Sequence, residues 1–384
     1  MSESLVAEKV VVYGQPSFKL ACDAVEAYVT ELGGHLAPVE FRLPGATVQP
    51  FAIAPWAEED LGAEVPAYQR VLRGDFFCLP FGMSSPPFRD EEYPLHGETA
   101  NEIWTLEGTE SAEGRCVLKM RLEMLRWPGV VTKEISVVKG QPAVYQSHVI
   151  SGVSGPMCFG THPMLQFPQK AGSGLLSLSE FEFGQVYPGD FEEPAQGGYS
   201  YLKPSAEFTD LRQVPTAVGG VTDLTRYPSH SGYSDLVQVL SNRGATRAWS
   251  AVSFPEQGFV WFSLKDPRVL NGTVLWLSNG GRHYAPWNGR HVAVLGVEEL
   301  TGYFGFGMPE SATENPFVRK GFATTVTMHP EKPTVVRTVM GVAPIDIQFG
   351  HVVAIEPTKS GVEIVSENGS KVDVEVDTKF VWPD

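Results

Sequence analysis

The chain has 384 residues, of which 42% are hydrophobic and 19% are charged, a composition that indicates a folded globular protein and excludes a disordered one. Its net charge of −16 argues against nucleic acid and anionic membrane surfaces as partners. Continuous apolar runs are short, whereas a helix that crosses a bilayer needs about 20 apolar residues. The first residues carry no basic and apolar leader, so we expect no secretory signal, no membrane association and a cytoplasmic location.

Four cysteines lie far apart in the sequence and form no C-x-x-C pair, namely Cys22, Cys78, Cys116 and Cys158. Several have apolar neighbours, which favours buried free thiols in a reducing compartment. The histidines likewise lack cysteine or carboxylate partners at the spacing of a metal site. We therefore expect neither a disulfide framework nor a bound metal.

The segment Asp23–Glu31 is the first element that the sequence defines, and its Val-Glu-Ala-Tyr-Val core is compatible with a helix or a strand. We favour a strand, which the pair Gly33 and Gly34 would close. Further along, Val117–Leu125 and Val131–Val138 alternate between apolar and polar residues, as half-buried antiparallel strands do.

The C-terminal part of the chain predicts a β-hairpin around residues 361–378. Val362–Val365 and Val372–Val376 alternate on either side of Asn368 and Gly369, and Asn-Gly readily takes the positive φ angles of a type I′ turn. Short strands separated by turns along the whole chain predict an all-β fold, either a sandwich or a barrel.

No linker divides the sequence, so we interpret residues 1–384 as a single domain. Residues 185–220 come nearest to a linker because they are rich in Pro, Gly and Glu, but they also contain aromatic residues that a flexible spacer would lack. We interpret this segment as a long ordered loop. Loops of this length in compact domains are often functional.

Three clusters carry the candidate chemistry, and the first begins at Arg73. A run rich in glycine and aromatic residues ends at Gly82, and His96 and Gly97 follow on a predicted loop. A histidine beside a glycine, with an aromatic residue nearby, suits a polar ligand with an apolar face. The alternative is a loop histidine that makes only a structural hydrogen bond.

The second cluster is His162, which Pro163 follows. Proline favours an extended backbone at the preceding residue, and the imidazole would then project from a strand end, where a general acid could act. The alternative is a core histidine bonded to a backbone carbonyl.

The third cluster is the pair Glu298 and Glu299 near the end of the apolar run His291–Leu300. A buried carboxyl group costs free energy unless it is paired or used, and partial burial raises its pKa towards the range of a general base. Because side chains alternate along a strand, we expect Glu298 to face inward and Glu299 outward. The alternative is a strand end with two solvated acids.

Other chemistries lack their usual motifs. The sequence has no G-x-S-x-G run, no Walker phosphate-binding loop and no G-x-G-x-x-G run that opens a helix. Phosphate-binding and nucleotide-binding functions therefore lose their usual support.

Taken together, the clusters resemble the galactose mutarotase-like superfamily, over about residues 30–304. The matching motifs occur in the same order, and they are Gly33-Gly34, Arg73-Gly74, His96-Gly97, Thr161-His162 and Gly296-Val297-Glu298. The stretch from Arg73 through Phe81 and Gly82 to His96 and Trp104 is similar to the hexose-phosphate mutarotase branch. The run that ends at Asp235 looks like the sugar-binding aspartate of the superfamily.

The resemblance implies a large antiparallel β-sandwich, also called a supersandwich, that binds a small-molecule sugar. It implies that Glu298 is the base on the anomeric hydroxyl, that His162 is the acid that protonates the ring oxygen, and that His96 hydrogen-bonds the same region. Further sugar contacts would come from Arg73 and Asp235. We expect sugar-face stacking from nearby aromatic side chains, with Phe81, Trp104 and Trp287 as candidates.

In the implied mechanism, a carboxylate with a raised pKa and a protonated imidazole open the hemiacetal ring. Rotation about the C1–C2 bond and closure on the other face then invert the anomer. No cofactor is needed, because the reaction involves no redox step and no carbanion.

The sequence departs from the hexose-phosphate branch at two positions. Ala100 stands where that branch carries an arginine, and Asp75 replaces its second glycine. Because a phosphate-binding cation is missing and the chain is acidic, we expect a neutral sugar in preference to a sugar 6-phosphate.

These observations predict a carbohydrate-active enzyme, an isomerase of the aldose 1-epimerase (mutarotase) type. One alternative is a non-catalytic carbohydrate-binding protein on the same fold, which would need no buried base at Glu298. Another is a different sugar reaction, catalysed by an isomerase, lyase or hydrolase with another acid/base pair.

Overall fold

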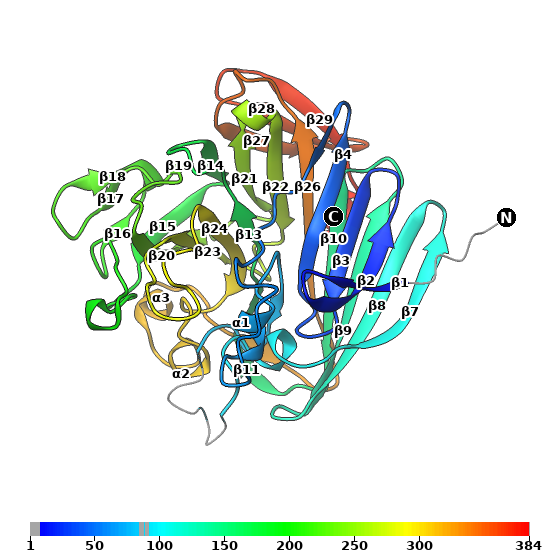
Figure 1. Cartoon of the computed structure of the whole chain (residues 1–384), viewed down its shortest axis with the longest axis horizontal. Helices are drawn as coiled ribbons and strands as arrows, with labels where there is room; N and C mark the ends of the chain where they lie inside the picture. Colours follow the sequence, from blue (N-terminus) through cyan, green and yellow to red (C-terminus); the bar gives the residue numbers. More distant parts are fainter. Residues whose placement is uncertain (1–7, 84–87, 89–91, 384) are drawn as a thin grey trace.

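Antiparallel β-sheets make up most of the regular secondary structure, as the alternating sequence predicts (Figure 1). The computed structural model describes residues 8–83, 88 and 92–383. One sheet has nine strands, in the order β19 (Arg226–Tyr227), β14 (Gly174–Leu178), β21 (Ala248–Phe254), β22 (Phe259–Lys265), β26 (Thr334–Pro344), β10 (Ala143–Ser151), β9 (Gly129–Val138), β8 (Arg115–Met124) and β7 (Thr105–Ala112). An eight-stranded sheet has the order β16 (Glu207–Phe208), β15 (Phe181–Val186), β20 (Tyr233–Ser241), β23 (Gly272–Asn279), β24 (Val294–Thr301), β12 (Phe159–Thr161) and β6 (Phe77–Cys78), with β13 (Met164–Gln166) paired to β24.

Smaller sheets and short helices complete the chain. An N-terminal sheet holds β1 (Glu8–Val12), β2 (Gln15–Ala21), β3 (Val25–Thr30), β4 (Leu36–Leu43) and β5 (Ala46–Val48), and a C-terminal sheet holds β27 (Val352–Pro357), β28 (Gly361–Ser366) and β29 (Lys371–Glu375). Two-stranded pairs are β11 (Gly155–Met157) with β25 (Val326–Met328) and β17 (Val214–Pro215) with β18 (Val221–Thr222). The helical segments are α1 (Ala67–Arg70), α2 (Met308–Ser311), α3 (Pro316–Arg319) and the 3₁₀ turns η1 (Glu98–Ala100), η2 (Pro194–Gln196), η3 (Leu211–Gln213), η4 (Pro255–Gln257) and η5 (Thr378–Phe380). Within the described ranges, no helix has the length and apolarity that crossing a membrane requires.

Strand β22 shows how the layers are built, because it is buried on both faces. Phe259 and Trp261 belong to the main core, whereas Val260 and Phe262 belong to a second core that includes residues of the C-terminal sheet. Successive side chains of a strand point to opposite faces, so one strand serves both cores. The C-terminal sheet therefore covers the face of the nine-stranded sheet that lies opposite the main core.

The structure confirms the strands that alternation predicts. The predicted strand Val117–Leu125 lies within β8 apart from its last residue, Val131–Val138 lies within β9, and the two strands pair antiparallel. The segment Asp23–Glu31 contains the strand β3 and no helix. All four cysteines are free thiols, and three of them are buried.

The C-terminal hairpin is confirmed as β28 and β29, but the prediction of a type I′ turn is wrong. That turn requires positive φ at both Asn368 and Gly369, and only Gly369 has one, at 85°. The Gly369 N–H donates to the Ser366 carbonyl at 2.9 Å, and the Ser366 N–H donates to the Ser370 carbonyl at 2.8 Å. The loop is therefore a type I turn that ends on a left-handed glycine, a three-residue connection.

Residues 185–220 hold two short strands, β16 and β17, and the turns η2 and η3. Phe208 and Leu211 are buried in the main core, and Tyr187 and Phe191 pack against it. These apolar contacts give the segment a fixed path across the eight-stranded sheet, unlike that of a flexible spacer.

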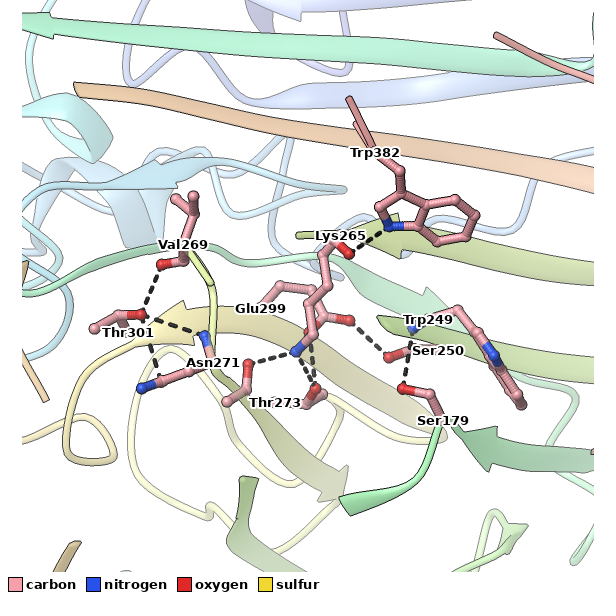
Figure 2. A network of polar contacts seen from close by, with 11 residues as sticks. Ser179, Trp249, Ser250, Lys265, Val269, Asn271, Thr273, Glu299, Thr301 and Trp382 are labelled. Atoms are coloured by element: carbon pink, nitrogen blue, oxygen red, sulfur yellow. Dashed lines mark hydrogen bonds and ion pairs between the residues drawn. The ribbon is translucent and has the colours of Figure 1, made fainter. Parts of the chain in front are cut away.

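A buried ion pair joins the two large sheets (Figure 2). Glu299 on β24 pairs with Lys265 on β22 and accepts hydrogen bonds from the Ser250 hydroxyl at 2.6 Å and the Thr273 hydroxyl at 2.7 Å. The Lys265 ammonium also donates to the Gly272 carbonyl at 2.7 Å. Both charged side chains are at most 1% exposed. The expectation that Glu299 faces outward is therefore wrong, because the interior of the sandwich lies on its side of β24.

Replacing Glu299 by Gln keeps the shape of the side chain and removes the charge that neutralises Lys265. Removing one partner of a buried ion pair costs about 3–5 kcal/mol, so the free energy of unfolding should fall by about that amount. Urea denaturation followed by tryptophan fluorescence measures the change. The control Glu182→Gln breaks an exposed pair with Arg243, which water screens, and should change the free energy of unfolding far less. Equal stability of the two variants would contradict the structural role of Glu299.

Candidate functional site

A cavity of about 200 Å³ opens on the eight-stranded sheet, with Leu236 of β20, Trp276 of β23 and Glu298 of β24 in its lining. Glu298 faces this cavity because its neighbour Glu299 occupies the opposite, sandwich side of β24. The cavity is smaller than the ~300–1,000 Å³ typical of sites for drug-sized ligands, so its size suits a ligand of about one sugar ring.

Glu298 lies fully inside the protein, and a glycine makes room for it. A Cβ atom on Gly296, two residues earlier on the same face, would lie 2.6 Å from Glu298 Oε1 and 3.0 Å from the Cβ of Trp276. Burial raises the pKa of Glu298 well above its usual range, and the nearby Arg282 opposes this shift only in part. The carboxyl group therefore favours its protonated form.

His162 lies between β12 and β13 and points at Glu298. Its Nε2 atom is 3.3 Å from Glu298 Oε1, and its ring stacks on Phe76 with centroids 4.5 Å apart. Its backbone N–H donates to Asp75 Oδ1 at 2.7 Å, which fixes the position of the ring from behind. Burial, and secondarily the neighbouring His96, hold the pKa of His162 well below its usual range, so the imidazole is neutral.

His96 completes the cluster from the loop before η1. Its φ angle is 65°, a left-handed conformation that non-glycine residues seldom adopt and that is concentrated at functional sites. Gly97 is required beside it, because a Cβ there would lie 2.0 Å from the Leu79 carbonyl oxygen. The His96 ring meets the His162 ring edge-on at 5.0 Å, and burial lowers the pKa of His96 to about 3. The structure thus brings His96, His162 and Glu298 together.

The walls of the cavity are mainly aromatic. Phe81 and Trp287, both predicted to contact the ligand, line it. Sequence reasoning missed four further aromatic side chains of the lining, which are Tyr68, Tyr187, Phe191 and Trp276. Apolar ring faces of this kind suit the C–H face of a sugar.

Three predicted binding residues lie outside this cavity. Arg73 is fully buried and donates to the carbonyls of Val71, Val12 and Tyr13, so its guanidinium anchors the N-terminal hairpin. Burial lowers the pKa of Arg73 to about 10. The prediction of a sugar contact at Arg73 is therefore withdrawn, because its donors already bind the protein.

Trp104 and Asp235 are likewise occupied elsewhere. The Trp104 indole N–H donates to the Thr99 carbonyl at 2.9 Å in the interior. Asp235 Oδ1 accepts the backbone N–H groups of Tyr201 at 3.0 Å and Leu202 at 2.9 Å, and the residue lines an adjoining pocket rather than the main cavity. Their predicted roles as sugar contacts are withdrawn for the same reason.

Arg282, which sequence reasoning also missed, supplies the cation of the cavity. It lies in the connection between β23 and β24, and the pair Gly280-Gly281 directly before it is the local signal that a chain turn brings it there. Its Nε atom donates to Glu192 Oε1 at 2.5 Å, and Glu192 comes from the 185–220 segment. That segment therefore contributes to the site, as its length suggests.

Among known proteins, the ones found to be similar to this chain are solved structures. No family model matches the chain, and a search of curated proteins finds no match. A "putative mutarotase" from Salmonella typhimurium is 13% identical with a TM-score of 0.55, over 86% of this chain and 91% of that chain. A "putative aldose 1-epimerase" from Klebsiella pneumoniae is 11% identical with a TM-score of 0.60, over 87% and 80% of the two chains.

A third similar structure is a galactose mutarotase related enzyme from Lactobacillus acidophilus, 8% identical with a TM-score of 0.53 over 86% of this chain and 98% of that chain. Identities this low establish the fold and leave the chemistry to the site itself. The all-β prediction is confirmed: the chain has the galactose mutarotase-like fold, a large antiparallel β-sandwich.

Proposed function

We propose that the chain is an aldose 1-epimerase-like mutarotase, an isomerase that interconverts the anomers of a free, neutral monosaccharide. The observation that carries the proposal is the 3.3 Å contact between His162 Nε2 and Glu298 Oε1 within an aromatic cavity. The fold adds support by analogy, because one fold can host many chemistries.

Opening a pyranose ring moves two protons. The O1 hydroxyl loses a proton, the C1–O5 bond breaks as the C1 carbonyl forms, and O5 gains a proton. Rotation about the C1–C2 bond presents the other carbonyl face, and closure reverses both transfers. Catalysis therefore requires one proton donor and one proton acceptor that reach the same sugar.

His162 and Glu298 supply this donor and acceptor while holding one proton between them. Burial raises the pKa of Glu298 and lowers the pKa of His162, so the carboxyl group carries the proton and the imidazole is the acceptor. The resemblance implies the opposite arrangement, a carboxylate and an imidazolium, which desolvation disfavours here. Direct contact lets the proton pass between the two residues, and each arrangement offers one donor and one acceptor.

The remaining lining holds the sugar in place. Phe81, Trp276 and Trp287 offer apolar faces to the C–H groups of the ring, and His96 offers a neutral imidazole for a hydroxyl hydrogen bond. Because His96 is neutral, it adds no charge beside His162 and Glu298. The charge next to this pair therefore stays the same while the protons move.

Glu298→Gln keeps the size of the side chain but cannot transfer a proton. We expect kcat to fall at least about 100-fold, the usual share of a general acid/base residue, while sugar affinity changes less than about threefold. Exchange of anomeric protons measured by NMR, across a panel of free aldoses, gives the rate. The surface variant Glu256→Gln, whose carboxyl pairs with Lys170 in solvent, serves as the control and should match the wild type.

Two results would count against the proposal. Full activity of Glu298→Gln would remove the acid/base role of that residue. Sugar binding by a wild-type protein that does not speed up exchange would instead identify a non-catalytic carbohydrate-binding protein.

The pKa shifts also predict the pH dependence. Because burial holds the pKa of His96 at about 3 and the pKa of His162 well below 6.5, both rings stay neutral as pH falls from 7.5 to 5. Over this range their ring C–H signals should not titrate in NMR spectra, whereas histidines of the urea-unfolded chain should titrate near 6.5. Correspondingly, kcat/KM should hold as pH falls to 5, and should decrease at high pH when Glu298 loses its proton. A titration of either ring near pH 6.5 would contradict the neutral pair.

A further inference from the structure

Arg282 and Glu192 form a buried ion pair at the edge of the cavity. Arg282 Nε donates to Glu192 Oε1 at 2.5 Å, and the Tyr284 hydroxyl donates to Glu192 Oε2 at 3.4 Å. The side chain of Glu192 is 2% exposed and that of Arg282 is 18% exposed. Gly198 makes this possible, because a Cβ there would lie 2.8 Å from Glu192 Oε2. The carboxylate therefore lies behind the guanidinium, away from solvent.

The two partners face different spaces. Arg282 lines the main cavity with His162 and Glu298, whereas Glu192 lines the adjoining pocket. Glu192 engages only the Nε side of the guanidinium. Neither terminal nitrogen of Arg282 has a hydrogen-bond partner among the residues that the structure describes. The two terminal NH2 groups thus remain available to a ligand.

Aromatic rings hold the guanidinium in one orientation. Its carbon atom lies 4.6 Å from the Trp287 ring centroid, 5.2 Å from that of Trp276 and 5.3 Å from that of Phe191. His162 contacts the same Trp276 ring edge-on, with centroids 5.9 Å apart. Arg282 and His162 thus both contact the Trp276 ring and both line the same cavity of about 200 Å³, so a single sugar ring in it can reach both groups.

We propose that Arg282 binds two oxygen atoms of an uncharged sugar, and that Glu192 makes the cavity selective against anionic sugars by cancelling the guanidinium charge. This inference rests on the proposed function, since it assigns the substrate class of the same site. Arg282 is the orienting donor, and Glu192 is a positioning residue that acts through it.

The charges around the cavity support an uncharged ligand. Among the described residues that line the main cavity and the adjoining pocket, Arg282 is the one that carries a positive charge. Glu192 neutralises this charge. The adjoining pocket carries three carboxyl groups, from Asp190, Glu192 and Asp235. A phosphate or carboxylate on the sugar would meet these groups with no unpaired cation to offset its loss of hydration. Hydroxyl groups bear no such cost, and their oxygen atoms can accept hydrogen bonds from both terminal NH2 groups.

The test compares dissociation constants for D-glucose, D-glucuronate and D-glucose 6-phosphate, and for the matching galactose series, by calorimetry and tryptophan fluorescence. The wild type should bind the neutral sugar at least 10-fold more tightly than either anion. Glu192→Gln leaves the guanidinium charge uncompensated, so the ratio of the constants should shift at least 10-fold towards the anions. Glu193→Gln, at an exposed neighbour that accepts from Gln196, makes the same change in net charge and should leave the ratio unchanged.

Arg282→Lys provides a second route if Glu192→Gln does not fold. Lysine keeps the charge and can pair with Glu192, but it lacks the planar fork that presents two fixed donors. Affinity for the neutral sugar should then fall at least 10-fold while the preference over anions is retained. Thermal denaturation confirms that each variant is folded.

Equal affinity of the wild type for neutral and anionic sugars, or unchanged ratios in Glu192→Gln, would overturn the inference, as would no binding of any of the six probes. These readouts are independent of turnover. Loss of the proposed isomerase activity with preserved discrimination would reject the proposed function alone, and activity with unchanged ratios would reject the role of the ion pair alone.

Discussion

Strand β24 is buried on both faces, yet it carries two neighbouring carboxyl groups, Glu298 and Glu299. A low-dielectric interior tolerates a carboxyl group only when a cation pairs with it or when it keeps its proton. The two residues differ in this respect: Glu299 pairs with Lys265, whereas Glu298 keeps its proton beside His162. The inter-sheet pair of Glu299 fixes β24 against the nine-stranded sheet, and the preceding residue, Glu298, is thereby fixed in the cavity.

A second polar layer lies behind His162 and holds it in register. Asp75 accepts the backbone N–H of His162 on one oxygen and the amide of Gln146 on the other. Lys133 donates to the Gly34 carbonyl and lies 5.5 Å from the Trp104 ring centroid. Burial raises the pKa of Asp75 to about 6 and lowers the pKa of Lys133 to about 8, so each pKa moves towards 7 while both groups still carry charge at pH 7. The layer shows why Trp104 packs inward: its ring covers a buried ammonium group and is not available to a sugar.

Sequence reasoning succeeded where a local rule governs the structure. Alternation located β8 and β9, and the glycine that follows His96 indicated a loop, where a Cβ would collide with the Leu79 carbonyl. It failed where the outcome depends on a distant partner. The burial of Glu299 depends on Lys265, 34 residues away, and that of Arg73 on the carbonyls of an N-terminal hairpin about 60 residues away. The pairing of Arg282 with Glu192 spans 90 residues, and no local sequence pattern predicts it.

The C-terminal sheet, described above as the cover of a second core, sets the order in which the molecule can be completed. Val260 and Phe262 point to the face that this sheet covers, and the indole of Trp382, which follows the sheet in the chain, donates to the Lys265 carbonyl at 2.8 Å. Synthesis proceeds from the N-terminus, so the apolar outer face of β22 is complete long before its cover exists. Until the residues of the C-terminal sheet have been made, that face is open to water and to other chains, so the nascent protein exposes an apolar surface that favours aggregation during this interval.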